Sequence, residues 1–256
     1  MLEMSQAAEQ VLFLAEKKKL KDVDIVVERN ESLDLEIQDG KVEKVEQSTS
    51  LGLGVRVLDE GRTGLASTER LSLESIEIAF KNACENAKMH DPTEVIMLDP
   101  PKKIPDSSLL ALYNPELEKL NSDQLAELGF SIEDSVKAAD NRVVSIPYLG
   151  VSRGRHEYLL LSSTGVFYTQ HSNEVAAWCG PLLQDGDSRK SGMKILNRRE
   201  WDPNAGKRVG EEAVEKAVEL LNASPIKSAK MPVVLDEYTA PDFLRMYFGA
   251  FSGEAA

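Results

Sequence analysis

The sequence has little cysteine, little histidine and no long apolar run, and each shortage excludes a class of protein. Two cysteines, Cys84 and Cys179, occur in 256 residues, so a disulfide framework of more than one bridge is excluded. The three histidines allow a histidine-based zinc centre only if all of them converge, because a catalytic zinc takes about three protein ligands. The apolar run at residues 11–14 is far shorter than the roughly 20 residues of a membrane-spanning helix.

Basic residues are outnumbered by acidic ones, which bears on the partners of the protein. The formal net charge is −13 and the isoelectric point is about 4.8, and an acidic surface repels phosphate backbones. The longest lysine run, at residues 17–19, falls at a predicted helix end, where cations complement the helix dipole. The N-terminus lacks a basic leader and a cleavage pattern. We therefore expect a cytoplasmic protein with neither nucleic-acid nor membrane partners.

Residues 23–68 read as short strands joined by tight turns, and the rest of the chain is organised around them. Asp39 and Gly40 separate two alternating apolar segments, which is the strongest short signal for a β-hairpin. Residues 51–57 continue with period 2, and Gly52 and Gly54 leave one face small, which suggests close approach by another backbone. The segment predicts a meander of about four or five strands.

Helical spacing of apolar residues predicts a helix at residues 5–20 and another from a cap at Ser72 to about residue 88. The second pattern places Cys84 on the buried face. A thiol nucleophile at this position is the functional alternative, but no neighbouring signal lowers the pKa of the thiol, so we interpret Cys84 as a core residue. Two further helices are predicted, one capped by Ser122 with Ala139 on its inner face and one capped by Asp202 with Leu220 on its inner face.

A proline-rich connector at residues 91–114 divides the chain into two blocks, at residues 1–90 and 115–222. The second block carries five predicted strands. The order helix, strands, helix occurs in both blocks, which indicates a structural duplication. Grouped strands predict an α+β fold with two antiparallel strand-rich blocks, each flanked by helices. The five strands are expected at residues 143–151, 157–162, 166–172, 175–183 and 191–197.

The C-terminal segment predicts the start of another domain. Residues 231–235 read as a short buried strand, and residues 240–256 carry apolar side chains at helical spacing. We expect an N-terminal α+β domain at residues 1–228 and, at residues 229–256, the beginning of a truncated C-terminal domain.

Several stretches of the sequence resemble the PmbA/TldD family, which was named for modulators of DNA gyrase and is linked to intracellular metallopeptidases. The resemblance covers most of the chain and corresponds to the N-terminal portion of the family. Its motifs are patterns of glycine and turn residues. They lie at residues 37–43, 52–68, 161–166, 201–203, 232–235 and 251–255.

The resemblance implies a zinc site in the catalytic TldD branch, where a helix carries a His-Glu pair and a second histidine. Here His156 and Glu157 form a superficially similar pair, but no second histidine follows within a helical turn and the setting is strand-like. The other histidines, His90 and His171, are distant in sequence. Residues 238–245 also depart from the catalytic pattern, so the chain is similar to the PmbA (TldE) branch, and we expect neither catalytic nor metal-ligating residues in it.

Two hypotheses for function remain. In the first, the chain is a PmbA/TldE-like, non-catalytic subunit that associates with a TldD-like metallopeptidase, or with itself, and helps to hold an extended peptide for proteolysis. Zinc then belongs to the partner, and strand-rich blocks suit an extended peptide. In the second, the chain is a stand-alone regulatory module that binds peptides or proteins. A self-sufficient hydrolase would need ligands that the sequence does not show.

Overall fold

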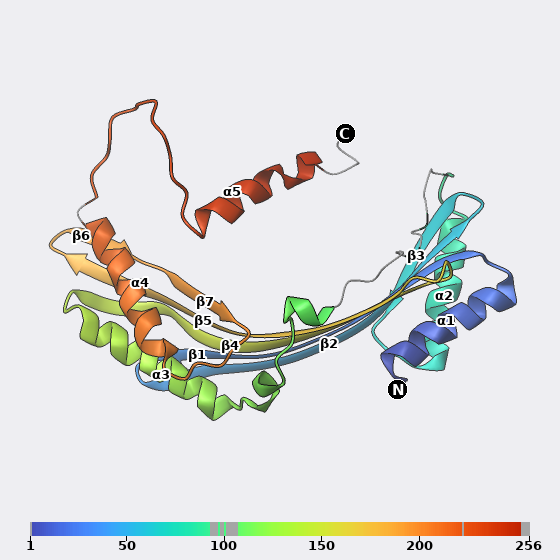
Figure 1. Ribbon diagram of the computed structural model, residues 1–256, viewed down its shortest axis with the longest axis horizontal. Helices are drawn as coiled ribbons and strands as arrows, with labels where there is room; N and C mark the ends of the chain where they lie inside the picture. The colour runs from blue at the N-terminus through green and yellow to red at the C-terminus, as the bar shows by residue number, and fades with distance from the viewer. Residues whose placement is uncertain (1, 93–96, 98–99, 101–106, 222, 252–256) are drawn as a thin grey trace. The chain divides into compact units, whose positions relative to one another are not determined.

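A computed structural model describes residues 2–92, 97, 100, 107–221 and 223–251. In these residues the chain forms five α-helices and seven β-strands, and the strands belong to one sheet. Figure 1 shows the long strands β1, β2, β4 and β5 running side by side, with α1 and α2 at one end and α3 and α4 at the other. The bounds are α1 Met4–Lys18, β1 Asp22–Gln38, β2 Lys41–Asp59, β3 Arg62–Thr68, α2 Leu73–Ala87, α3 Ser122–Ala139, β4 Val143–Ser162, β5 Phe167–Asp185, β6 Ser188–Ser191, β7 Lys194–Arg198, α4 Ala205–Leu221 and α5 Thr239–Phe248.

The predicted α+β class and the hairpin at Asp39 and Gly40 are confirmed. Both turn residues have positive φ, 51° and 72°, and they join β1 to β2. The predicted number of strands is wrong in both blocks. Residues 23–68 form three strands instead of four or five, and residues 143–198 form four instead of five, because β1, β2, β4 and β5 each continue through a polar middle part. Ladder hydrogen bonds from both neighbours keep β1 and β4 extended there.

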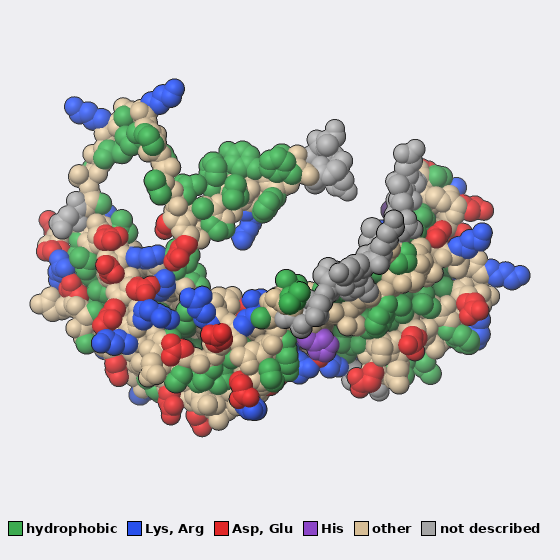
Figure 2. All heavy atoms as spheres, in the orientation of Figure 1, with side chains coloured by type: hydrophobic (Ala, Val, Ile, Leu, Met, Phe, Trp, Pro, Cys, Tyr) green, Lys and Arg blue, Asp and Glu red, His purple; other side chains and the backbone are tan. Residues whose placement is uncertain are grey.

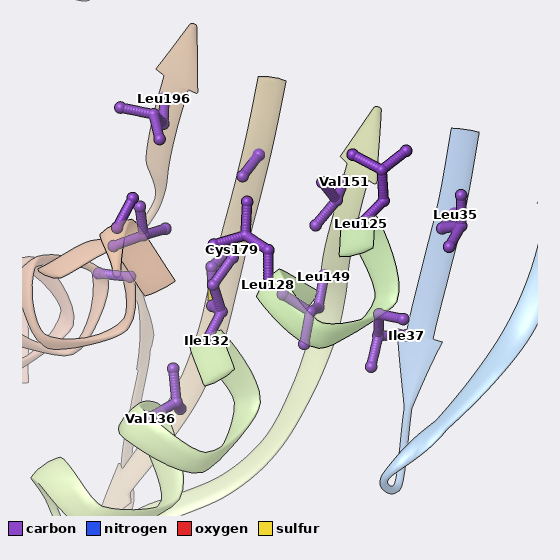
Figure 3. Packing of buried hydrophobic residues seen from close by; sticks show 14 of the residues in the cluster. Leu35, Ile37, Leu125, Leu128, Ile132, Val136, Leu149, Val151, Cys179 and Leu196 are labelled. Atoms are coloured by element: carbon purple, nitrogen blue, oxygen red, sulfur yellow. The ribbon is translucent and has the colours of Figure 1, made fainter. Parts of the chain in front are cut away.

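Two hydrophobic cores lie on the same face of the sheet, one at each end. Opposed residues on paired strands share a face, and side chains alternate along each strand. The core under α1 and α2 takes Ile25 from β1 and Leu159 from β4, whereas the core under α3 and α4 takes Leu35 from β1 and Val151 from β4. Figure 3 shows Leu35 and Ile37 beside Leu149 and Val151, facing Leu125, Leu128, Ile132 and Val136 of α3.

Both cores therefore draw on both halves of the sequence. Strands β1 and β4 pair antiparallel from Asp24 opposite Ser162 to Glu36 opposite Gly150. Each strand begins in one core and ends in the other, so the two blocks predicted from the sequence share one continuous sheet.

A repeated packing detail supports the predicted duplication. A Cβ atom built on Gly64 of β3 would lie 1.9 Å from the backbone oxygen of Ala83 in α2. In the second half, a Cβ on Gly192, which precedes β7, would lie 2.2 Å from the backbone oxygen of Ala213 in α4. In each half, therefore, a glycine lets the sheet and a helix approach at backbone contact.

Helix ends follow the predicted chemistry, with three corrections. The Ser72 side chain accepts a hydrogen bond from the Ser75 backbone nitrogen at 3.1 Å, as expected for the cap of α2. Helix α3 is capped by Asn121 instead of Ser122, because Asn121 and Gln124 form a reciprocal capping box. Helix α4 begins at Ala205, after a turn held by Asp202. Ala139 and Leu220, both predicted to face inward, are exposed because they lie off the buried stripes of α3 and α4.

An ion pair at the end of α3 makes part of the stability depend on pH. The guanidinium of Arg142 lies 2.7 Å from a carboxylate oxygen of Asp140, and these hydrogen bonds lower the pKa of Asp140 to about 2. Because the folded pKa is depressed, the pair stabilises the fold above the ordinary carboxyl pKa and loses this effect as pH falls from about 4 towards 2. We expect Asp140→Asn to destabilise by about 1 kcal/mol at pH 7 and progressively less below pH 4.

Urea unfolding of wild type and Asp140→Asn between pH 7 and pH 3 checks this prediction. Asp187→Asn is the control, since Asp187 is exposed in the turn between β5 and β6. A difference between wild type and Asp140→Asn that stays constant over this pH range would contradict it.

The chain divides into two compact units, residues 1–222 and 223–256. In the second unit, residues 231–235 form no strand, and the predicted burial is wrong: Val234 is 96% exposed. No other strand occurs among the described residues of this unit, so the segment lacks a pairing partner. Helix α5 follows the predicted helical spacing and ends in a short 3-10 turn, and Figure 2 shows apolar side chains along it. Outside the described residues lie 252–256 and, within the predicted connector, 93–96, 98–99 and 101–106.

Candidate functional site

The face of the sheet opposite the helices carries an apolar cavity. Both hydrophobic cores use the side chains on the other face. On the open face, a cavity of about 640 Å³ lies over β1, β2, β3 and β4. Its volume falls in the range of ligand-binding pockets, about 300–1,000 Å³. The residues that line it include Asp24, Val26, Gly54, Arg56, Leu65, Tyr158 and Leu160.

Gly54 forms part of the floor of this apolar cavity, and its lack of a side chain leaves the space above it open. Gly54 has ordinary extended backbone, and a Cβ built on it would meet nothing within 4 Å. The same holds for Gly52, two residues away on the same face. The sequence predicted a close approach of another backbone here, but no described residue makes it. Glycine weakens a strand, and nothing in the packing of the described residues requires glycine at these two positions.

Two carboxylates lie at the apolar cavity, and they differ in whether an ion pair neutralises them. At one end Asp24 accepts a hydrogen bond from the Nε of Arg56 at 2.8 Å. At the other end Glu28 lies opposite Tyr158 in the register and is exposed, with no ion pair among the described residues. Burial raises the pKa of Tyr158, and the charge of Glu28 raises it further. The rim of the cavity therefore carries one neutralised pair and one available carboxylate.

The open face continues into a second, polar cavity. It has a volume of about 320 Å³ and lies next to the apolar cavity along β1 and β4. Its lining includes Asn30, Ser32, His156, Ser172 and Glu174. The open face thus offers an apolar recess followed by hydrogen-bonding groups along the strand direction, which is an arrangement suited to an extended chain.

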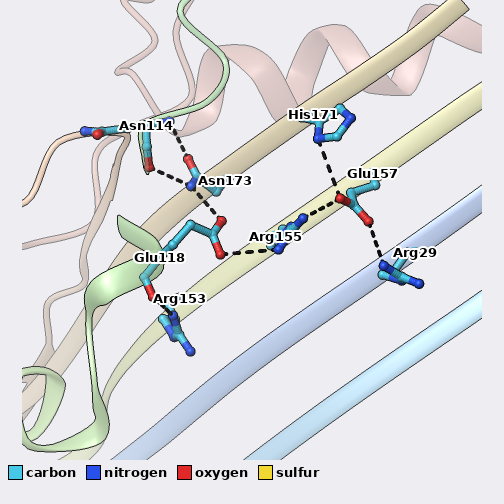
Figure 4. Close-up of polar contacts among 8 residues, drawn as sticks. All are labelled: Arg29, Asn114, Glu118, Arg153, Arg155, Glu157, His171 and Asn173. Atoms are coloured by element: carbon cyan, nitrogen blue, oxygen red, sulfur yellow. Dashed lines mark hydrogen bonds and ion pairs between the residues drawn. The ribbon is translucent and has the colours of Figure 1, made fainter. Parts of the chain in front are cut away.

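On the helix-bearing face, a polar cluster separates the two hydrophobic cores (Figure 4). Glu157, with a side chain only 9% exposed, lies 3.2 Å from Arg29 and also pairs with Arg155. Its Oε1 atom is 3.6 Å from Nδ1 of His171. Arg155 in turn contacts Glu118 at 3.5 Å. A buried carboxylate is tolerated here because two guanidinium groups compensate its charge.

A nearly buried asparagine fixes the loop that borders this cluster. The side-chain oxygen of Asn173 accepts a hydrogen bond from the backbone nitrogen of Asn114 at 2.8 Å, and its amide nitrogen donates to the backbone oxygen of Asn114 at 2.8 Å. The same amide nitrogen donates to Glu118 at 3.1 Å. Asn173 therefore anchors the 3-10 turn Pro115–Lys119 to β5, and we interpret the cluster as structural.

Replacing the buried carboxylate should destabilise the fold markedly. Glu157→Gln keeps the shape of the side chain but leaves Arg29 and Arg155 without their shared counter-charge. Loss of one partner of a buried pair costs about 3–5 kcal/mol. Because the two arginine side chains are 31% and 32% exposed, we expect a smaller loss, about 2 kcal/mol.

Urea unfolding at pH 7 measures this loss, with Glu174→Gln as the control. Glu174 is exposed, and no ion pair is seen for it among the described residues, so its substitution should change stability by less than about 0.5 kcal/mol. Equal destabilisation by the two substitutions would contradict a structural role for the Glu157 carboxylate.

The three histidines do not converge. His156 and His171 lie on adjacent strands, but His156 is opposite Ser172 and His171 is opposite Glu157, so the two imidazoles occupy opposite faces of the sheet. His90 is exposed just beyond the end of α2. Among the described residues, no three His, Cys, Asp or Glu side chains are grouped so that they could hold a metal ion. The described side chains therefore do not fit the zinc that the family resemblance implies for the TldD branch.

Both thiols are buried. Cys84 lies on the inner face of α2, as predicted, and burial raises its pKa. Cys179 is in the core under α3 and α4, and burial raises its pKa to about 12. A thiol with a raised pKa carries little thiolate at neutral pH, so the geometry gives neither cysteine the character of a nucleophile.

The sequence did not predict two features of the structure, namely the apolar cavity and the buried polar cluster. The cavity needs β1 and β4 as neighbours, and no local pattern pairs strands so distant in sequence. The cluster had a weak signal. Arg153, Arg155 and Glu157 alternate in the same period as the apolar side chains Leu159 and Leu161, so strict alternation would have placed them on the core face.

Comparison with known proteins gives matches in both halves of the sheet-bearing unit. The family model described as PmbA/TldA metallopeptidase domain 1 matches residues 23–87, and the one described as PmbA/TldA metallopeptidase central domain matches residues 115–221. Metalloprotease PmbA of Escherichia coli O157:H7 is 23% identical over 241 residues, covering 90% of this chain and 51% of that protein. The chain thus spans about half the length of the curated relatives it matches.

Solved structures share the fold at low identity. A proposed modulator of DNA gyrase from Bacteroides thetaiotaomicron has a TM-score of 0.84 at 22% identity, covering 100% of this chain and 59% of that one. TldE from Thermococcus kodakarensis has a TM-score of 0.71 at 20% identity, covering 83% and 47%. Separately, no helix in the described part of the chain has the length and apolarity needed to cross a membrane.

Proposed function

The chain belongs to the PmbA/TldD family of metallopeptidases, and from this premise we propose that it is a non-catalytic, PmbA/TldE-like subunit. It associates with a zinc-bearing catalytic subunit of the same family and holds an extended peptide on the open face of its sheet. The observation that carries the proposal is that face itself, where the apolar cavity of about 640 Å³ adjoins the polar cavity of about 320 Å³.

The arrangement of side chains supports a holding role over a cleaving one. The open face supplies apolar surface, hydroxyl groups and amides, but among the described residues it has no grouped metal ligands. Both thiols lie in the cores on the other side of the sheet. Pockets for alternate side chains contribute to the recognition of an extended peptide, and on the open face the apolar and polar cavities follow one another along β1 and β4.

The acidic character of the chain is consistent with peptide handling and unfavourable for direct contact with DNA. The net charge of −13 repels phosphate backbones, so the gyrase-related name of a structural neighbour gives no reason to expect a nucleic-acid site here. We propose that the protein acts in the cytoplasm, as expected from its sequence.

Co-purification tests the partnership directly. The tagged 256-residue chain is co-expressed with a catalytic relative that carries the His-Glu helix, and the complex is analysed by size-exclusion chromatography with light scattering. We expect a stable complex of defined stoichiometry and chelator-sensitive cleavage of unstructured peptides by the pair. A chain that binds peptides but never associates with a catalytic relative would overturn the subunit role and favour the stand-alone binding module.

A further inference from the structure

The apolar cavity has features that indicate what kind of side chain it accepts. Leu65, which lines it, is 62% exposed. Val26 and Leu160 are only partly buried in its floor. The open space over Gly54 adds depth. A bulky apolar side chain placed here would cover these groups and remove their apolar surface from water.

The charges next to the cavity indicate what should accompany the apolar side chain. Glu28 follows Val26 by two residues on the same face and lies directly opposite Tyr158, and both neighbours line the cavity. Its carboxylate has no ion pair among the described residues. Asp24, at the other end, is already neutralised by Arg56. An occupant with a cation beside its apolar group would therefore meet a complementary charge at one end only.

We propose that this cavity is a specificity pocket for an extended peptide segment in which a bulky apolar residue is followed or preceded by lysine or arginine. The apolar side chain fills the space over Gly54, and the cation pairs with Glu28. The inference rests on the proposed peptide-holding function and names its substrate class.

Binding of short peptides to the whole 256-residue chain tests the proposal without any catalytic partner. The probes are acetylated, amidated peptides of serine and threonine with a central Phe-Arg, Ala-Arg or Phe-Gln pair, measured by isothermal titration calorimetry. We expect replacement of Phe by Ala to weaken binding by about tenfold or more. Replacement of Arg by Gln should weaken it by about threefold, and this effect should vanish at high salt.

Matched variants locate the site. Gly54→Phe places an aromatic side chain in the cavity, at a position where a Cβ meets nothing within 4 Å, and should weaken Phe-Arg binding by about tenfold or more. Glu46→Phe adds the same side chain to the same strand and face, beyond both cavities, and should change affinity by less than about twofold. Glu28→Gln should weaken the Phe-Arg peptide by about threefold and leave the Phe-Gln peptide unaffected. Unchanged unfolding curves confirm that each variant is folded.

The outcomes separate this inference from the proposed function. Wild-type affinity in Gly54→Phe, or equal loss in Gly54→Phe and Glu46→Phe, would overturn the pocket. Absence of any peptide binding, while the chain still forms an active complex with a catalytic relative, would also overturn the pocket and leave the subunit role standing. Peptide selectivity as expected, without any such complex, would support the pocket and count against the subunit role.

Discussion

Neither half of the sheet-bearing unit should fold alone. A fragment of residues 1–90 keeps α1, α2 and β1–β3 but loses Leu159 and Leu161, which β4 contributes to their core. It also exposes Leu35 and Ile37, which belong to the other core. Each buried aliphatic side chain contributes about 1.5–3 kcal/mol, and a domain is stable by only about 5–15 kcal/mol in total. We expect residues 1–90 and 107–222 each to lack a cooperative unfolding transition.

Circular dichroism during urea titration measures this, with residues 1–222 as the matched control, since they form one compact unit. The control should unfold cooperatively. Mixing the two fragments should restore part of the strand signal, because β1 and β4 pair through residues 24–36 and 150–162. Cooperative unfolding of either fragment alone would show that the shared strands are not essential to the cores.

The second large effect is expected at the backbone contact of Gly64. Gly64→Ala places a methyl group 1.9 Å from the backbone oxygen of Ala83 and 2.4 Å from the backbone nitrogen of Ala87. Neither atom can move without shifting α2 from the sheet. Overpacking against side chains costs about 1–3 kcal/mol, and because the obstacle here is backbone we expect at least about 3 kcal/mol of destabilisation.

Gly52→Ala is the matched control, since it makes the same change on the neighbouring strand β2. Its Cβ would meet nothing within 4 Å, so the substitution should be neutral or stabilise by up to about 1 kcal/mol through the unfolded state. Chemical unfolding of both variants gives the comparison. A loss in Gly64→Ala no greater than in Gly52→Ala would mean that α2 does not pack on β3 at backbone distance.

Local features of this fold were predictable from the sequence because their causes are local. The Asp39-Gly40 turn needs two residues with positive φ, and Asp-Gly is a pair that adopts this conformation readily. Ser72 caps α2 through a hydrogen bond to a residue three positions away. The burial of Cys84 follows from helical spacing alone. In each case the deciding interaction lies within one turn or one hairpin.

The remaining features depend on pairing across long sequence distances. The alignment of β1 with β4 brings Arg29 opposite Glu157, and no periodicity encodes that partner. The polar middle parts of the long strands look like loops in sequence, because their neighbours in the sheet, which satisfy their backbone groups, are invisible there. The error at residues 231–235 has the opposite origin, since apolar, β-prone residues form a strand only when another strand is available to pair with.

The central claim is that this chain holds peptides but leaves catalysis to a partner, and metal analysis combined with a peptidase assay tests it most directly. The purified 256-residue chain is assayed for bound zinc and for cleavage of unstructured peptides, alone and after addition of a catalytic relative with the His-Glu helix. The account predicts substoichiometric zinc and no cleavage by the chain alone, and chelator-sensitive cleavage once the partner is present. Stoichiometric zinc together with chelator-sensitive cleavage by this chain alone would contradict it.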